Sequence, residues 1–419
     1  MRIVVAPDSF KGSAAARQAA EAIARGLAAG WPNALIELYP MADGGEGTLD
    51  ALAGWERLAV DAVDARRRPI TAVYGRDGDQ ALVELSAASG LPAVADALDA
   101  RAADTFGSGL VLRHALERGA RRILLTLGGS ATTDGGAGIL TALGARLLDA
   151  AGGEVPPGGA GLSRVARIDL AGLIPQARSA SWRLACDVDN PLLGRRGAAA
   201  VFGPQKGASP DDVACLDAAL ADWADVVSRD LGPIDVGTPG MGAAGGAGVA
   251  LVAAFGAELI PGARMVAEAT GLPDALAGAD LVVTGEGSFD SQSLGGKVVG
   301  TVAALARAAG APVWVVAGRA VLDGIDLPGA GIARVAALDD GRPLSELMAQ
   351  ALPLIERAAA ALTGAGRPVG GTQRVRSTSV SRASQVATSR GCDPSEEMSK
   401  TISVHSETSC GNRNVTTLD

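Results

Sequence analysis

Acidic and basic side chains that could act on an anionic ligand come together between residues 185 and 209. Asp187 follows an apolar stretch, and Arg195 and Lys206 come after it in a region rich in Gly and Pro. Such a segment offers a carboxylate, cations and free backbone N–H groups, which together can orient a hydroxyl group and bind an anion. Asp187 is the expected base. Arg195 either pairs with a ligand carboxylate or is a solvated surface residue.

Lysine is scarce in this chain. Among 37 Lys and Arg residues, lysine occurs only at Lys11, Lys206, Lys297 and Lys400. A chain that uses arginine nearly everywhere should keep lysine where a compact ammonium group is needed. The first three lysines lie in Gly-bearing turns. We therefore expect Lys11, Lys206 and Lys297 to contact anionic groups of a ligand.

The first turn of the chain contains Ser9 and Lys11. An apolar run at 2–6 predicts a strand, and the pattern of 13–30 predicts a helix. A turn that leads from a strand into a helix presents N–H groups to an anion. The alternative is that Ser9 only caps the helix.

A second acidic turn contains Asp43 and Glu46 among three glycines, after a predicted strand at 35–39. Glycine disfavours a helix interior, so these residues form a turn. Loops at the carboxyl ends of strands hold ligands in open α/β sheets, which favours a cleft position over a plain cap. Asp43 is the second candidate for the catalytic base.

A Gly-rich loop follows a predicted strand at 122–127 and precedes a predicted helix that extends to about Leu148. Gly129 and Ser130 lie in this loop. Glycines leave backbone N–H groups unobstructed, so the loop is a candidate phosphate cradle.

A third acidic loop follows a predicted strand at 280–284. Glu286 and Asp290 offer the oxygen ligands that Mg²⁺ prefers, and Lys297 follows them. The end of the loop is similar to a Walker A motif, but Ser291 replaces its first Gly and Val298 its Ser/Thr. The P-loop interpretation therefore fails.

Composition excludes several classes of protein. The chain has 419 residues, 48% of them hydrophobic, and a formal net charge of −9, which argues against nucleic acid and acidic membranes as partners. Four cysteines without close pairing indicate no disulfide framework, so the reducing cytoplasm is the expected compartment. Two histidines make a His metal site or a Ser-His-Asp triad a poor explanation. No stretch predicts a membrane span.

The composition changes after Gly366. From Arg367 the chain is rich in Ser and Thr and has no apolar period, which is typical of disorder. A non-native extension is the other interpretation of residues 366–419.

Seven motifs together resemble one family. They are Ala-Pro-Asp-Ser-Phe-Lys-Gly at the start, Ala-Asp-Gly-Gly-Glu-Gly-Thr at 42–48, Gly-Gly-Ser-Ala-Thr at 128–132, Cys-Asp-Val at 186–188, Val-Phe-Gly-Pro-Gln-Lys-Gly-Ala at 201–208, Gly-Ala-Ala-Gly-Gly at 242–246 and Thr-Gly-Glu-Gly at 284–287. In this order the chain resembles the bacterial glycerate kinase family, of the glycerate 2-kinase type, over about residues 1–365. Thr133 stands where many relatives carry Asn.

The resemblance implies an α/β fold of two domains. Residues 1–65 with 260–365 would form a flavodoxin-like parallel-sheet domain, and residues 66–259 an inserted mixed α/β domain, with the active site between them. It also implies ATP-dependent phosphorylation of D-glycerate to 2-phosphoglycerate, with ATP and Mg²⁺ as cofactors. A homodimer is one assembly open to such a protein.

Phosphoryl transfer needs cations for the phosphates and a base near the acceptor hydroxyl. We assign Asp187 as the base, with Asp43 second, and Mg²⁺ to carboxylates from Glu286, Asp290 or Asp43. Lys11, Lys206 and Lys297 would share the phosphates and the substrate carboxylate, and the loop at Ser130 would donate N–H groups.

Three alternatives stay open. The same kinase could form 3-phosphoglycerate. A dinucleotide-dependent oxidoreductase is favoured by Gly240, Gly242 and Gly245, which match G-x-G-x-x-G, but no strand is predicted before them. Close packing explains these glycines better. A non-catalytic sensor of organic acids would bind glycerate without consuming ATP.

Overall fold

The structure is a computed structural model that describes residues 1–45, 47–52 and 54–364. The described residues all belong to one unit of the chain. Glu46 and the predicted tail at 366–419 lie outside them.

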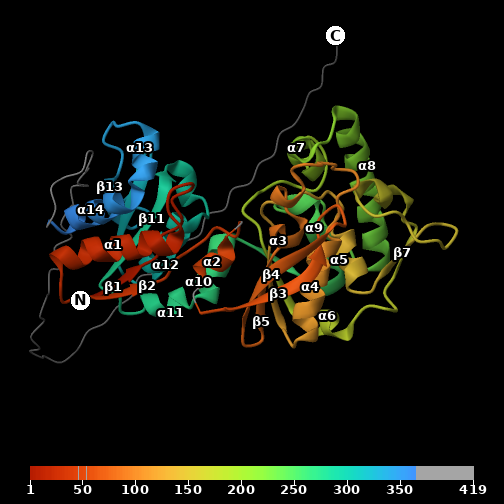
Figure 1. The fold of residues 1–419 in the computed structure, drawn as a ribbon, viewed down its shortest axis with the longest axis horizontal. Helices are drawn as coiled ribbons and strands as arrows, with labels where there is room; N and C mark the ends of the chain where they lie inside the picture. The colour runs from red at the N-terminus through yellow and green to blue at the C-terminus, as the bar shows by residue number, and fades with distance from the viewer. Residues whose placement is uncertain (46, 53, 365–419) are drawn as a thin grey trace, which may run out of the picture. The chain divides into compact units, whose positions relative to one another are not determined.

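Five strands form the first sheet (Figure 1). They are β1 (Arg2–Val5), β2 (Leu35–Leu38), β11 (Leu281–Phe289), β12 (Val313–Ala320) and β13 (Ile332–Ala337). Every pair is parallel, in the order β13-β12-β11-β1-β2. This is the flavodoxin-like order, so the predicted parallel-sheet domain is confirmed.

Helices cover both faces of this sheet. They are α1 (Ala16–Gly30), α2 (Thr48–Ala51), α10 (Gly262–Ala269), α11 (Leu272–Leu276), α12 (Val298–Ala308), α13 (Leu344–Ala349) and α14 (Ala351–Thr363). Ile3 and Val5 of β1 pack with α1 and α14, whereas Val4 packs with α10 and α12. Because successive strand residues point to opposite faces, a strand buried on both sides must be apolar throughout.

Six strands form the second sheet. They are β3 (Glu56–Val63), β4 (Pro69–Asp77), β5 (Gln80–Glu84), β6 (Arg122–Thr126), β9 (Ser181–Ala185) and β10 (Glu258–Ile260). Their order is β10-β9-β6-β5-β4-β3. The pairs among β3, β4 and β5 are antiparallel and the others parallel, which confirms the predicted mixed α/β domain.

The remaining elements pack around the second sheet. They are α3 (Ser86–Ser89), α4 (Phe106–Glu117), α5 (Ala137–Ala142), α6 (Pro175–Ser179), α7 (Ala198–Phe202), α8 (Pro210–Asp230), α9 (Ala247–Phe255) and the hairpin strands β7 (Arg146–Leu148) and β8 (Arg167–Asp169). The helix predicted to reach Leu148 ends at Ala142, because Gly144 has a φ of 107° and turns the chain into β7. Among the described helices, none combines the length and apolarity that crossing a membrane requires.

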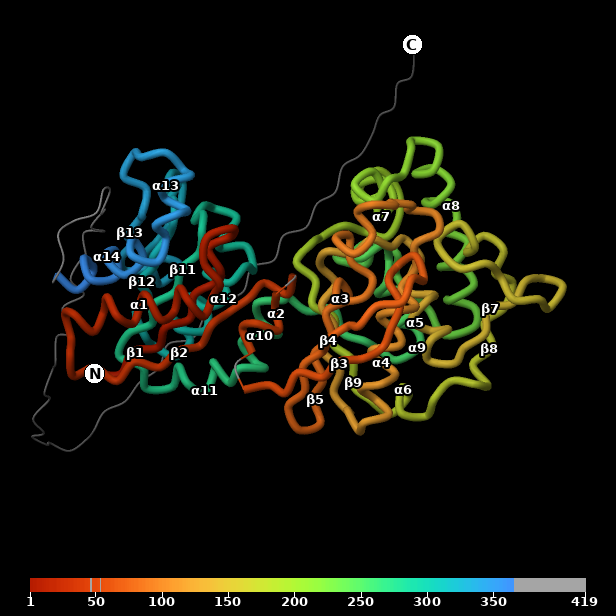
Figure 2. Tube along the Cα trace, in the orientation of Figure 1, coloured from red at the N-terminus to blue at the C-terminus, as the bar shows by residue number. Residues whose placement is uncertain are grey.

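The chain begins in the first sheet, continues through the second sheet and then returns to the first, as the colours from red to blue in Figure 2 show. The second domain is therefore an insertion. β3 pairs with β4 in the second sheet, and β10 pairs with β9. We accordingly propose seams before Glu56 and after Ile260, in place of the predicted seams at 65/66 and 259/260.

Candidate active site

The carboxyl end of β1 lies beside the middle of β11, where the strand order of the first sheet reverses. The backbone N–H of Asp8 donates to the carbonyl oxygen of Gly285 at 2.8 Å, and Thr284 Oγ1 donates to the carbonyl of Ala6 at 2.8 Å. In open α/β sheets ligands bind outside the strand ends at this switch point. Asp8 therefore joins the candidate site, although the sequence analysis gave it no role. Its place directly after the first strand was the signal available.

Three carboxylates from three strand ends influence one another. Asp8 follows β1, Asp43 follows β2 and Glu286 lies within β11. Burial, and then the charges of Asp43 and Glu286, raise the pKa of Asp8 to about 7, although Asp8 accepts a hydrogen bond from Ser9 N at 2.7 Å. Burial also raises the pKa of Glu286. Carboxylates crowded in this way favour a cation among them.

Glu286 fits a metal better than its neighbours do. It is 8% exposed, and its Oε1 atom has no hydrogen-bond partner among the described residues. No three Asp, Glu, His or Cys side chains in the described part of the chain lie close enough to form a full cage. Mg²⁺ is usually held by one or two carboxylates with water and substrate phosphates, so a cage is not required. The donor set therefore suits Mg²⁺.

Asp290 and Lys297 lie after Glu286, at the start of two helices. Asp290 Oδ1 accepts a hydrogen bond from Gln292 N at 2.9 Å, and Asp290 N donates to Ser293 Oγ at 3.0 Å. Asp290 is thus an N-cap as well as a candidate metal ligand. Lys297 is exposed at the N-cap position of α12, and its charge acts on both Glu286 and Asp187.

Asp187 lies two residues beyond β9. Its Oδ1 accepts a hydrogen bond from the backbone N–H of Gly262 at 2.8 Å, at the first residue of α10. The side chain is accessible, yet the surrounding protein displaces enough water, together with the charge of Asp43, to raise its pKa to about 6, although the bond from Gly262 and the charge of Lys297 oppose that shift. The carboxylate is thus oriented and easily protonated, as a proton acceptor requires.

Two glycines allow the loops to approach Asp187. A Cβ atom on Gly262 would lie 2.0 Å from the carbonyl oxygen of Asp43, and one on Gly44 would lie 2.9 Å from Ala185 Cβ. A side chain at either position would push Asp43 and Asp187 apart. The glycines therefore keep these two carboxylates in one site.

A cavity of about 240 Å³ joins five of the eleven predicted site residues. Its wall contains Asp43, Asp187, Gly129, Ser130 and Lys206. Gly129 has a φ of 73°, which glycine adopts without strain, and a Cβ there would lie 3.2 Å from Ser86 Cβ. A glycine loop, a hydroxyl group and two carboxylates thus line one cavity that is large enough for a small ligand.

Lys206 is buried rather than free to meet phosphate. It is 2% exposed, and its Nζ donates to Thr132 O at 2.6 Å and to Ser130 Oγ at 3.2 Å. Burial lowers the pKa of Lys206 to about 7, and Asp134 opposes that shift. Two of its three donors hold the Gly-rich loop, which leaves one donor for a ligand.

Other predicted residues lie outside this cavity. Arg195 is exposed, does not line it and forms no ion pair within the described residues. Lys11 is exposed beside Asp8, and Ser9 is half-buried with its N–H on the Asp8 carboxylate. These positions depend on how the turn after β1 folds onto β11, which spacing alone does not reveal.

The glycines of the G-x-G-x-x-G match allow close packing of the backbone. Residues 231–239 contain no strand, so the dinucleotide motif lacks its context. A Cβ on Gly242 would lie 2.3 Å from Pro191 O, and one on Gly245 would lie 2.1 Å from Thr132 O. The glycines allow the chain to pass close to the Gly-rich loop.

The two sheets and the acidic, glycine-lined cavity define an α/β protein with a candidate site for a small ligand. A model of the glycerate kinase family matches residues 3–365. The chain is 43% identical over 371 residues to a glycerate kinase of Halalkalibacterium halodurans, covering 85% of this chain and 96% of that one. It is 44% identical over 326 residues to the glycerate 2-kinase of Escherichia coli (strain K12), covering 76% and 85%. A crystal structure assigned to glycerate kinase 2 of Salmonella typhimurium LT2 matches with a TM-score of 0.77 and 40% identity, covering 87% and 97%.

The chain belongs to the glycerate kinase family. It is accordingly an enzyme of the kinase class, and the predicted family is confirmed.

Proposed function

We propose that the protein uses ATP to phosphorylate D-glycerate, forming 2-phosphoglycerate. The hydroxyl oxygen forms a bond to the γ-phosphorus, the bond from that phosphorus to the β-γ bridging oxygen breaks, and ADP leaves. The observation that carries the proposal is the position of Asp187, an oriented carboxylate in the wall of the cavity that also presents Ser130. The Escherichia coli relative named glycerate 2-kinase supports the 2-position.

Asp187 takes the hydroxyl proton or orients the hydroxyl group, with Asp43 as the second candidate. Asp187 Oδ1 is engaged by Gly262, so Oδ2 is the atom that faces the substrate. A general base is most effective when its pKa lies near the pH at which the enzyme works, and the pKa of about 6 for Asp187 meets that condition.

Gly129 and Ser130 donate to phosphate oxygens, as a loop with free N–H groups does. Lys11 and Lys297 are exposed cations near the acidic strand ends, where they neutralise phosphate charge. Lys206 holds the loop and keeps one donor for the ligand. Ser9 orders the turn after β1, and for Arg195 we propose no contact inside the cavity.

Glu286 would hold Mg²⁺, with Asp290 as the second protein ligand. When it is bound, the ion neutralises the negative charge of the phosphate oxygens. Asp8 completes the acidic environment on the first sheet.

Formation of 3-phosphoglycerate is the main alternative, because glycerate has hydroxyl groups on carbon 2 and carbon 3, and a base at this position can accept a proton from either of them. The oxidoreductase alternative loses its support, since the glycines at 240–245 pack against backbone. The cytoplasm is the compartment we propose, and a homodimer stays a prediction.

The test is an assay of ATP consumption with the full chain and Mg²⁺. We expect ADP release that depends on D-glycerate and stops when EDTA removes the metal. Binding of D-glycerate without ADP release would instead identify a sensor. Reduction of NAD(P) by glycerate would identify an oxidoreductase.

A further inference from the structure

A second cavity lies in the inserted domain and shares no lining residue with the candidate active site. Its volume is about 370 Å³, within the range of small-molecule sites. Arg67, Phe106 and Thr141 lie on its wall, with the apolar side chains of Leu147 and Val155. Asp104 and Glu154 also line it, so the wall is partly polar, and it suits a small ligand that has a charged end and an apolar body.

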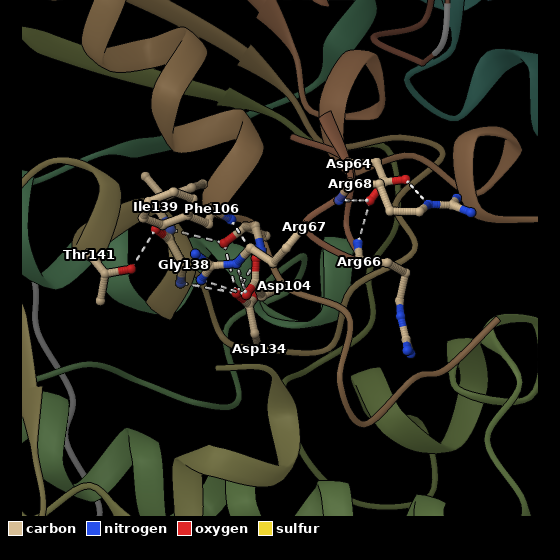
Figure 3. A network of polar contacts seen from close by, with 11 residues as sticks. Asp64, Arg66, Arg67, Arg68, Asp104, Phe106, Asp134, Gly138, Ile139 and Thr141 are labelled. Atoms are coloured by element: carbon tan, nitrogen blue, oxygen red, sulfur yellow. Dashed lines mark hydrogen bonds and ion pairs between the residues drawn. The ribbon is translucent and has the colours of Figure 1, made fainter. Parts of the chain in front are cut away.

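Arg67 is held in an unusual conformation at this wall. Its φ is 62°, a left-handed value that is strained for a residue other than glycine. Its Nε donates to Asp104 Oδ2 at 2.8 Å, its Nη2 forms an ion pair with the same oxygen at 2.7 Å, and its guanidinium carbon lies 3.8 Å from the centre of the Phe106 ring (Figure 3). These contacts fix the plane of the guanidinium group.

At this wall, the group with an unused hydrogen-bond donor is the guanidinium of Arg67. Among the described residues, none accepts from Arg67 Nη1, whereas Asp104 is 1% exposed and also accepts from Phe106 N at 3.0 Å. A ligand can therefore add an acceptor but gains little from adding a donor. At the rim, Arg146 pairs with Glu154 at 3.2 Å, and both are more than half exposed. A surface pair of this kind is weak, so Arg146 is a second available cation.

The wall of this cavity is connected to the candidate active site through Asp134. Asp134 is fully buried and accepts from Thr105 N at 2.8 Å and from Gly138 N at 3.0 Å, and Gly138 lines the second cavity (Figure 3). The charge of Asp134 also acts on Lys206, which holds Ser130 in the first cavity. A shift of the 104–106 segment would therefore reach the Gly-rich loop.

We propose that the second cavity is an effector site for a small organic monocarboxylate. The carboxylate pairs with Arg67 Nη1 and with Arg146, and the apolar body lies against Leu147 and Val155. Occupancy alters turnover through Asp134. The binding part goes beyond the proposed function, whereas the kinetic part rests on it.

Benzoate is a suitable probe because it joins one carboxylate to an apolar ring, and benzyl alcohol is its uncharged control. Calorimetry on the full chain measures binding without any need for kinase activity. Arg67→Gly removes the guanidinium and suits the left-handed backbone. Thr141→Trp fills the cavity while Arg67 stays in place, so it serves if Arg67→Gly folds poorly. Asp187→Asn reports binding in the active site instead.

We expect benzoate to bind the wild type and the Asp187→Asn variant equally, and at least tenfold more weakly to Arg67→Gly and Thr141→Trp. Benzyl alcohol should not bind. Saturating benzoate should change kcat or a KM of the wild type at least twofold, with no change in Arg67→Gly. No benzoate binding, equal binding to Arg67→Gly, or loss of binding only in Asp187→Asn would overturn the site. Binding without a kinetic effect, in an enzyme that phosphorylates glycerate, would overturn the effector role.

Discussion

Asp187 Oδ1 and the backbone N–H of Gly262 form a hydrogen bond of 2.8 Å. It connects the end of β9 in the second sheet with the first residue of α10, which packs on the first sheet. Asp187 Oδ2 has no partner among the described residues. The bond therefore fixes one oxygen of the carboxylate, and in the proposed function the other oxygen faces the substrate hydroxyl.

Asp187→Asn should remove proton acceptance and preserve the bond from Gly262, since an amide oxygen can replace Oδ1. We expect kcat to fall by about 10²- to 10⁴-fold, the usual contribution of a general base, with little change in ATP affinity. Steady-state kinetics and calorimetry with ATP measure the two effects. Asp189→Asn, at an exposed position two residues on, is the matched control and should stay near wild type. Near-normal turnover of Asp187→Asn would refute the assignment.

The activity should rise with pH around pH 6. Asp187 accepts a proton only when ionised, and its pKa is raised to about 6, so kcat/KM should increase through that region and level off above it. The negative charge of Asp43 contributes to this raised pKa. Asp43→Asn should therefore move the acid limb to lower pH, whatever its effect on the maximum rate. An unmoved limb in a pH profile from 4.5 to 8.5 would show that the carboxylates do not interact.

Asp8 should make the stability depend on pH. Its pKa rises from 3.8 in the unfolded chain to about 7 in the folded one, so the folded state binds its proton more tightly. The stability from this group is complete below about pH 3.8 and is lost as the pH rises through 7. Thermal melts should show Asp8→Asn gaining a few degrees on the wild type between pH 4 and 7. Asp61→Asn, exposed on β3, should show no such gain, and parallel curves for Asp8→Asn would contradict the raised pKa.

Two lysines should respond differently to the same substitution. Lys206→Met leaves Thr132 O without its donor in a buried place, which costs about 1–3 kcal/mol and should lower the melting temperature. Lys297 is exposed, so Lys297→Met should leave the melting temperature unchanged and raise the KM for ATP about tenfold, equivalent to one lost charge contact. Melting curves and ATP kinetics of the two variants separate a structural role from a ligand contact. A stable Lys206→Met protein, or an unchanged KM in Lys297→Met, would reverse the assignments.

Local patterns predicted individual strands because these are short apolar runs with acidic turns after them, whereas the division into two domains was implied by the family resemblance. Asp43 and Asp187, which were chosen on this basis, both line one cavity, and their catalytic roles stay a prediction. Glu286 was predicted to follow its strand, but β11 continues to Phe289 and includes it. The reason is that β12 pairs with β11 as far as Ala320, a long-range contact that no local pattern contains.

The roles of single charged residues were harder to predict. A lysine in a glycine turn can be exposed, as Lys11 is, or buried under a loop, as Lys206 is, because the loop that covers it comes from elsewhere in the chain. Asp8 had no predicted role because its raised pKa depends first on burial and then on Asp43 and Glu286, which are distant in sequence. The strain at Arg67 is likewise a property of the folded backbone.

The most direct test of the central claim is the identity of the product. The full chain would be incubated with ATP, Mg²⁺ and D-glycerate labelled with ¹³C at carbon 2, and followed by ¹³C and ³¹P spectroscopy. We predict that carbon 2 acquires a coupling to phosphorus through a single oxygen, as 2-phosphoglycerate requires. A product with the phosphate on carbon 3 would contradict the proposed position, and ATP left intact with D-glycerate unchanged would contradict the kinase itself.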